Sequence, residues 1–367
     1  MRFFLFISIV QSILFLGHGF FYMTLVRFLG VASSPRLLAL RMAMGLFSVS
    51  LVLTSFLAFR YSNLLVRCLY TAAASWLGIL YLLILASILC WVFYGLAKLF
   101  HLSLDRKLLI EILIGMALLA SLYGIINSGA TRITRLNIQL SGLPGEWKGK
   151  TAVWVSDTHL GPVRNRGFSR HISTLVQNLH PDIVFIGGDL FDGEALDLDK
   201  VIEPFSQISS HYGTYFITGN HEEFTDNARY LDAVRRNGMR VLNNEKVELD
   251  GLQIIGVDYR DSRSEEQFRT ILQKVGIDRG KPSILLKHTP FNLQVAGEQG
   301  ISLQLSGHTH QGQVFLFRFI TRRVYQGYDY GLKSFGDLLV YTSSGAGTWG
   351  PPMRLDTKPE IVAITFR

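Results

Sequence analysis

Five short polar motifs in the second half of the chain carry side chains that could bind divalent metal ions. They are Asp157-Thr158-His159, Gly188-Asp189, Gly219-Asn220-His221-Glu222, His288 and Gly307-His308-Thr309-His310. Carboxylate, imidazole and amide-oxygen donors without a thiolate suit Mn, Fe, Zn or similar divalent ions. A single HxH motif is a weak signal, but the ordered set predicts a metal centre.

The number of donors indicates how many ions this centre would hold. Seven residues qualify as ligands: Asp157, His159, Asp189, Asn220, His288, His308 and His310. Seven donors are too many for one tetrahedral zinc ion. They suit two ions about 3.5–4 Å apart that share a bridging carboxylate, an arrangement that clamps a phosphoryl group and activates water.

Each motif follows a short apolar run that predicts a buried strand. The expected strands cover 152–155, 183–186, 215–218, 252–257, 284–286, 301–305, 339–342 and 361–366. Apolar residues at helical spacing over 172–179 and 231–234 predict helices between the early strands. Sites in α/β folds lie at the carboxyl ends of strands. The motifs should therefore meet at one edge of a layered α/β domain.

The first part of the chain has a different character, with few charges and long apolar runs. Segments at about 3–26, 39–59, 70–97 and 108–127 are long enough to cross a bilayer as helices. A cleaved signal peptide is the alternative for the first segment. Because that segment is longer than a signal core and lacks a small-x-small cleavage site, a retained span is favoured.

The composition predicts three regions along the chain. Residues 1–127 form a transmembrane region, 128–149 a linker rich in Gly, Ser and Pro, and 150–367 the catalytic domain. Within the linker, the alternating pattern at 136–140 predicts an edge strand. Both cysteines lie in the apolar region, so no disulfide can form within the catalytic domain, and the redox compartment is not determined.

The net charge of +8 does not indicate a nucleic-acid partner. No Lys/Arg-rich run with interleaved aromatic residues is present, and many arginines instead flank the apolar segments, where membrane-border charges are common. The flanking basic residues divide five against six between the two sides. The positive-inside rule therefore does not orient the chain.

The ordered motifs DxH, GDxxD, GNHE, H and GHxH resemble those of the calcineurin-like metallophosphoesterases. The resemblance covers about 150–367. The stretches 179–182 (LHPD), 307–313 (GHTHQGQ) and 347–354 (GTWGPPMR) are similar to the YkuE-like branch, which includes transmembrane members with several N-terminal spans. One departure is Gln311, which replaces the small glycine often found after GHTH and bears on pocket shape only.

This resemblance implies a fold and a role for each motif residue. The fold would be a four-layer αββα sandwich preceded by an N-terminal four-helix transmembrane region. One metal would be held by Asp157, His159 and His310, the other by Asn220, His288 and His308, with Asp189 as the bridge. His221 would be catalytic rather than a ligand, contacting the phosphate and stabilising the transition state or protonating the leaving oxygen. Metal-bound hydroxide would attack, without a covalent enzyme intermediate.

Five further residues allow both a functional and a structural interpretation. Trp349 and Arg354 border the substrate pocket or belong to a packed loop, and Arg164 and Arg166 meet substrate phosphate or lie in a solvated loop. Asp192, in the GDxxD motif, either orients a ligand or caps the following turn.

The expected function is that of a membrane-anchored phosphohydrolase acting on a phosphoester or pyrophosphate. Tethering close to a bilayer favours a phospholipid or lipid-linked substrate, with soluble nucleotides and phosphoproteins as the alternatives. The expected location is a bacterial inner membrane, with the catalytic domain on the cytoplasmic side on grounds of substrate supply. The alternative from another class is a non-catalytic binding or scaffold module. The oligomeric state is not determined by the sequence.

Overall fold

The computed structural model describes residues 2–193, 196–223 and 227–367 and divides them into two compact units. The helical unit comprises the chain up to Ile126 together with Gly350–Leu355. The other unit, named the catalytic unit after its expected role, comprises Asn127–Trp349 and Asp356–Arg367. The expected division of the chain at 127 and 149 is thus accompanied by a short return of the chain to the helical unit.

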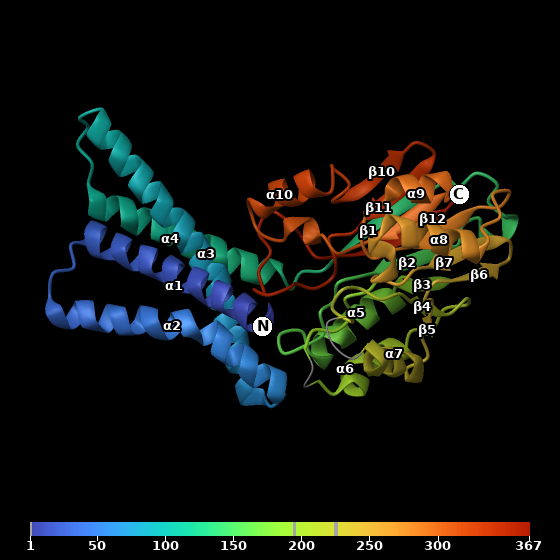
Figure 1. Ribbon diagram of the computed structural model, residues 1–367, viewed down its shortest axis with the longest axis horizontal. Helices are drawn as coiled ribbons and strands as arrows, with labels where there is room; N and C mark the ends of the chain where they lie inside the picture. Colours follow the sequence, from blue (N-terminus) through green and yellow to red (C-terminus); the bar gives the residue numbers. More distant parts are fainter. Residues whose placement is uncertain (1, 194–195, 224–226) are drawn as a thin grey trace. The chain divides into compact units, whose positions relative to one another are not determined.

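Four long helices form the helical unit (Figure 1). They are α1 (Arg2–Leu29), α2 (Ser34–Arg60), α3 (Leu64–Leu99) and α4 (Arg106–Asn127). All four are long and apolar enough to cross a membrane, and at most 39% of the most apolar window of any of them is buried inside the structure. Helices that are apolar on all sides yet largely uncovered are suited to a lipid environment.

The segment Gly350–Leu355 packs among these helices through Met353. This side chain is fully buried in a cluster that includes Phe21, Leu80 and Leu83. Glycines make room for it, since a Cβ added at Gly124 would lie 2.7 Å from an atom of Met353. The backbone N–H of Arg354 also donates to the carbonyl of Gly124 at 2.9 Å.

Two six-stranded sheets form the centre of the described catalytic unit. The first has the order β1-β12-β2-β3-β4-β5, parallel except where β12 meets β2. Its strands are β1 (Arg132–Ile138), β12 (Glu360–Phe366), β2 (Thr151–Val155), β3 (Ile183–Ile186), β4 (Thr214–Phe216) and β5 (Arg240–Val241).

The second sheet has the order β10-β11-β9-β8-β7-β6, with antiparallel pairs at both ends. Its strands are β10 (Gly331–Phe335), β11 (Leu338–Thr342), β9 (Leu303–Ser306), β8 (Ser283–Leu286), β7 (Leu252–Gly256) and β6 (Glu245–Leu249). The four inner strands are parallel, so their carboxyl ends lie on one edge.

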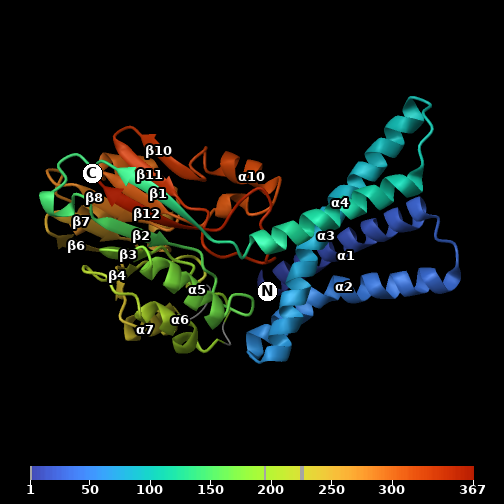
Figure 2. The same ribbon diagram turned by 180° about the vertical axis from the view of Figure 1, so that it is seen from behind.

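Helices cover the outer faces of both sheets, which makes four layers (Figures 1 and 2). The helices α5 (Arg166–Gln177), α6 (Leu198–Ser206) and α7 (Asn227–Arg236) cover the first sheet, and α8 (Glu265–Val275) and α9 (Leu293–Glu298) the second. Alternate residues of each strand face opposite layers: Trp154 packs between the sheets, while Val153 packs against the helices. The expected αββα sandwich is confirmed.

The eight expected strands and both expected helices are present, but several elements were not anticipated. The alternating pattern at 136–140 belongs to a longer strand, β1, which begins at Arg132 and pairs in parallel with β12. Hairpin strands β6 and β10 and helix α10 (Phe317–Val324) also had no assignment. β6 and β10 are outer strands whose side chains are mostly not buried, so no continuous apolar run marks them.

Trp147 anchors the stretch between β1 and β2 into the space between the sheets. It ends the short 3-10 helix η1 (Gly145–Trp147) and is fully buried. Its ring stacks on Tyr212 at a centroid distance of 4.6 Å, and its indole N–H donates to the carbonyl of Leu249 at 2.8 Å. The stretch expected to be a linker is thus part of the domain core.

We predict that Trp147→Ala lowers the free energy of unfolding of the full chain by about 3–5 kcal/mol, because it leaves a large cavity between the sheets. Trp147→Phe should cost less, since the ring packing is largely kept. Lys148→Ala, at an exposed neighbour, is the matched control. Calorimetric unfolding in detergent measures all three, and equal melting temperatures for Trp147→Ala and wild type would contradict the assignment.

Candidate metal centre

Five loops that follow parallel strands bring the sequence motifs together at one edge of the two sheets. The loops after β2, β3 and β4 carry Asp157 and His159, Asp189, and Asn220 and His221. The loops after β8 and β9 of the other sheet carry His288 and the His308/His310 pair. Both sheets therefore contribute to one polar cluster, as expected from the strand-end positions of the motifs.

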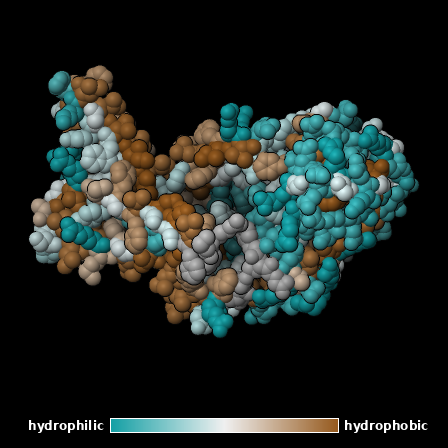
Figure 3. Space-filling view, viewed as in Figure 1, coloured by the Kyte–Doolittle hydropathy of each residue, from teal (hydrophilic) through white to brown (hydrophobic). Residues whose placement is uncertain are grey.

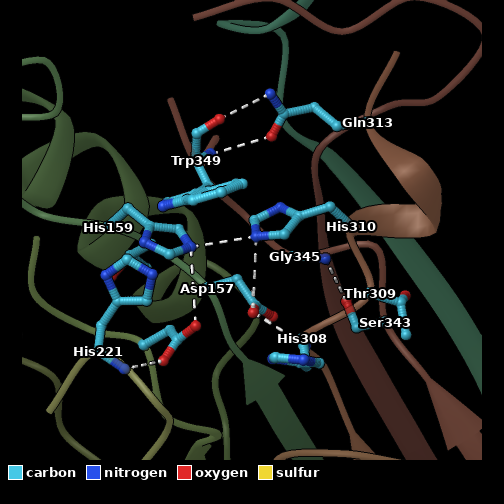
Figure 4. A network of polar contacts seen from close by, with 12 residues as sticks. Asp157, His159, His221, His308, Thr309, His310, Gln313, Ser343, Gly345 and Trp349 are labelled. Atoms are coloured by element: carbon cyan, nitrogen blue, oxygen red, sulfur yellow. Dashed lines mark hydrogen bonds and ion pairs between the residues drawn. The ribbon is translucent and has the colours of Figure 1, made fainter. Parts of the chain in front are cut away.

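One group of candidate ligand atoms is formed by Asp157, His159 and His310 (Figure 4). All three residues are buried, and the atoms lie within 4.8 Å of one another. The Nε2 atoms of the two histidines are 3.1 Å apart, and His310 Nε2 lies 3.8 Å from Asp157 Oδ1. Two nitrogens bound to one ion at about 2.1 Å would lie roughly 3 Å apart, so the spacing fits a shared ion.

A second group is formed by Asp189, His288 and His308. His288 Nε2 lies 3.2 Å from Asp189 Oδ2 and 3.2 Å from His308 Nδ1. The same Asp189 Oδ2 is 3.9 Å from His159 Nε2 in the first group. The Asp189 carboxylate thus faces both groups.

Several buried polar atoms of the cluster have no hydrogen-bond partner among the described residues. They include Oδ2 of Asp157, Nδ1 of His159 and Oδ1 of Asn220. Buried polar groups are nearly always paired, so orphaned lone pairs point to a missing partner. The oxygen atoms, with the facing imidazoles, fit a cation, and Asn220 lies in the loop after β4 directly before His221. The donor set present in the chain therefore fits divalent metal ions.

The backbone is held in an unusual conformation at most of these positions. Five candidate ligands have positive φ although none is glycine: Asp157 (54°), His159 (48°), Asp189 (49°), His308 (71°) and His310 (48°). Such values are uncommon for non-glycine residues and cost free energy. Glycines beside them allow close approach: a Cβ at Gly307 would lie 2.3 Å from the Asp157 carboxylate. The loop backbones therefore adopt strained conformations that place the side chains of the candidate ligands close together.

Burial and mutual charge set the protonation of the cluster. Burial lowers the pKa of His159 to about 4 and that of His308 to about 3, so both imidazoles are neutral near pH 7, the form that binds metal. Burial acts on His288 in the same direction, but the Asp189 carboxylate outweighs it and raises that pKa to about 9. Burial would raise the pKa of Asp189, yet the neighbouring histidines hold it well below its usual value.

His221 lies beside the two groups and pairs with Asp192. Its Nδ1 is 3.3 Å from Asp192 Oδ1, and its ring meets that of His159 edge-on at 4.6 Å. Burial lowers its pKa, but the hydrogen bond to Asp192 and the charges of Asp192 and Asp189 raise it to about 9. One nitrogen of His221 could reach a metal shared with His159 and Asp189. The contact with Asp192 instead favours a ring held for another role, and places Asp192 as its orienting partner.

Glu222 was part of a motif but had no assigned role, and the structure gives it one. Its buried carboxylate accepts four backbone N–H groups: those of Asp189, Leu190, Phe191 and Gly219, at 2.7–3.2 Å. Burial and the charge of Asp189 raise the pKa of Glu222 to about 7, and the hydrogen bonds oppose that rise. Glu222 therefore joins the loops that follow β3 and β4. The only hint of this role in the sequence was the position of Glu222, a charged residue directly after His221.

Of the residues with two interpretations, Trp349 also lies beside the candidate site. Its exposed ring meets His221 edge-on at a centroid distance of 6.3 Å. The side-chain amide of Gln313 holds its backbone from both sides, donating to the Trp349 carbonyl at 3.0 Å and accepting its N–H at 2.9 Å (Figure 4). Gln313, from the same GHTHQGQ stretch, is a positioning residue that the sequence did not single out.

Three arginines were considered for the substrate pocket or for phosphate binding. Arg354, expected at the pocket border or in a packed loop, is fully buried and belongs to the helical unit. Arg164 donates to the Ser128 carbonyl at 2.7 Å and lies over the Phe168 ring. Arg166 pairs with Glu203. Arg164 is thus held by the protein itself, and Arg166 by an ion pair whose side chains are 41% and 38% exposed, while a contact with substrate phosphate stays a prediction for both.

Comparison with known proteins places this geometry in a family. The model for calcineurin-like phosphoesterases matches residues 151–312. An uncharacterized metallophosphoesterase of Campylobacter jejuni is 31% identical over 271 residues, covering 72% of this chain and 71% of that protein. The chain belongs to the metallophosphoesterases.

Two other relatives define the branch more narrowly. The transmembrane protein with metallophosphoesterase domain of Danio rerio is 31% identical over 265 residues, covering 67% of this chain and 60% of that protein. The uncharacterized metallophosphoesterase YkuE of Bacillus subtilis is 28% identical over 257 residues, covering 64% and 85%. The expected resemblance to the YkuE-like and transmembrane members is confirmed, and with its four apolar helices the chain is a membrane protein.

We predict that Glu222→Gln lowers both the melting temperature and the affinity for Mn²⁺. A glutamine keeps one acceptor oxygen, so two of the four N–H groups lose their partner, at about 1–3 kcal/mol each. Glu248→Gln, which removes an exposed pair with Lys281, is the matched control. Calorimetry gives the stability and titration of metal-stripped protein gives the affinity. An unchanged affinity would contradict a role in shaping the Asp189 loop.

Proposed function

We propose that the chain is a membrane-anchored phosphohydrolase with two divalent metal ions, which hydrolyses a phosphoester or pyrophosphate. Asp157, His159 and His310 hold one ion in this proposal. Asn220, His288 and His308 hold the other, and Asp189 bridges them. Mn, Fe and Zn all suit this set of oxygen and nitrogen donors.

The observation that carries the proposal is the position of the Asp189 carboxylate between two separate ligand groups. One oxygen of Asp189 lies 3.2 Å from His288 and 3.9 Å from His159. A single-ion site would not need donors on both sides of this carboxylate. Two bound ions would supply Lewis acidity toward a phosphoryl group and an activated water.

His221 would act on the substrate rather than on the metals. The Asp192 carboxylate holds Nδ1, which leaves Nε2 to face a phosphoryl oxygen or the leaving oxygen. The nearby negative charges keep the ring protonated, so it can donate a hydrogen bond or a proton. Trp349, next to His221, would form one wall of the substrate pocket.

The substrate would be a phosphorylated molecule at or near a bilayer. The chain carries its own apolar helices, and only four residues lie between the end of α4 and the start of β1 in the catalytic unit. This short connection favours a phospholipid or lipid-linked phosphate over a soluble nucleotide. Supply of such substrates favours the cytoplasmic side of a cell membrane.

We predict that Asp189→Asn and His221→Ala each nearly abolish hydrolysis of bis(p-nitrophenyl) phosphate by the purified full chain with Mn²⁺. Loss of an acid–base group costs about 10²–10⁴-fold in rate. His221→Ala should keep its metal content, while Asp189→Asn should lose metal, both measured by elemental analysis. His171→Ala, at an exposed histidine, is the control. Full activity in either site variant would refute the assignment.

Metal binding also has a readout that does not depend on turnover. We predict that Mn²⁺ raises the melting temperature of metal-stripped protein, because an ion that binds only the folded state stabilises it. The ion would also satisfy the buried orphan atoms of Asp157 and Asn220. Asp189→Asn should blunt the rise. Absence of bound metal together with absence of activity would favour the alternative function, a scaffold module.

A further inference from the structure

The stretch from Phe315 to Val324 exposes an unusual amount of apolar surface for the catalytic unit. None of the residues in α10 (Phe317–Val324) is buried. Six large apolar side chains in this stretch are exposed by 39–58%: Phe315, Leu316, Phe317, Phe319, Ile320 and Val324. In Figure 3, brown apolar surface lies at the position of α10. Patches of this kind on a soluble domain mark an interaction surface.

The order of residues in α10 separates apolar and basic side chains. Phe317, Ile320 and Val324 follow helical spacing and form one stripe. Arg322 and Arg323 are exposed and form no ion pair among the described residues. The helix contains no acidic residue. An apolar stripe with flanking arginines is typical of helices that lie in the membrane interface, where the long basic side chains reach the lipid phosphates.

The connection to the helical unit ties the catalytic unit closely to a membrane span. α4 is long and apolar enough to cross a membrane, and only residues 128–131 separate it from β1. Four residues extend to at most about 14 Å, so the catalytic unit begins near the end of a membrane span. A negatively charged lipid surface complements the two arginines.

We propose that α10 is an interfacial helix that binds the surface of an anionic bilayer. Phe317, Ile320 and Val324 enter the acyl boundary, and Arg322 and Arg323 lie at the level of the lipid phosphates. The inference goes beyond the proposed hydrolysis and does not require it. Neither a bound metal nor turnover enters the argument.

The helix also adjoins the candidate metal centre. It begins seven residues after His310 and is followed by Tyr325, whose ring lies 6.3 Å from that of His308 and 4.6 Å from that of Phe291. A helix seated in the interface at this point would bring the centre to the lipid phosphates. The binding surface and the centre are thus parts of one side of the catalytic unit.

The test uses the full chain in nanodiscs with one protein per disc. Cys68 is exposed and is replaced by serine, while the buried Cys90 does not react in the folded protein. An NBD fluorophore is attached at Ile320→Cys, with Lys274→Cys, exposed on α8, as the matched control. The discs contain phosphatidylcholine and phosphatidylglycerol, with or without spin-labelled lipid.

We expect blue-shifted emission at position 320 and strong quenching by spin-labelled lipid, with neither effect at position 274. In discs that lack phosphatidylglycerol the quenching should weaken. Arg322→Glu with Arg323→Glu should reduce it in the anionic discs to the level of the neutral ones. The quenching should occur in metal-stripped protein too, which separates this inference from the proposed hydrolysis.

Two results would overturn the proposal. One is water-like emission at position 320 that iodide quenches and spin-labelled lipid does not. The other is a blue shift without lipid quenching, which would mean that protein covers the helix. A second preparation with two chains per disc identifies the covering partner: a shift that appears only there would come from a second copy. Loss of phosphodiester hydrolysis with intact lipid quenching would instead refute only the catalytic proposal.

Discussion

Carboxylates and imidazoles crowd together at the edge of two sheets, and their burial imposes a free-energy cost on the whole catalytic unit. Charged and polar groups taken out of water must find partners, and Asp157 and Asn220 retain buried oxygens with none. The strained φ values of the ligand-bearing loops add to this cost. Burial of apolar side chains between each sheet and its covering helices offsets this free-energy cost. A bound cation would supply the partner that these buried oxygen atoms lack.

Glu222 shows how the loops withstand this crowding. One carboxylate satisfies four amide groups from the turns after two different strands, and neither turn could be buried without such a partner. Gln313 plays a similar part around Trp349, with one amide group engaging both the carbonyl and the N–H. The side chains of Glu222 and Gln313 therefore supply the hydrogen bonds that these loop backbones would otherwise make within a regular strand.

The four-layer αββα order was implied by the family resemblance, while the sequence itself predicted a layered α/β domain with its motifs at one edge, because buried strands and the residues at their ends leave strong local patterns. It did not predict β6 or β10, whose side chains are mostly not buried. It also left the surroundings of Arg354 open, since nothing local reveals that a loop returns to the helical unit. Asp192 was left undecided between a cap and an orienting group, and only the distance to His221 separates these roles. Contacts between distant residues leave no periodic signal.

Met353 has a consequence for the order in which the protein is assembled. Its side chain is fully buried among helices that are synthesised long before it, and it stands only four residues after Trp349. Because Met353 follows all four helices in the sequence, its place beside glycines 78 and 124 can be filled only after those helices have been synthesised. The packing of the helical unit is therefore completed only when nearly the whole chain has left the ribosome.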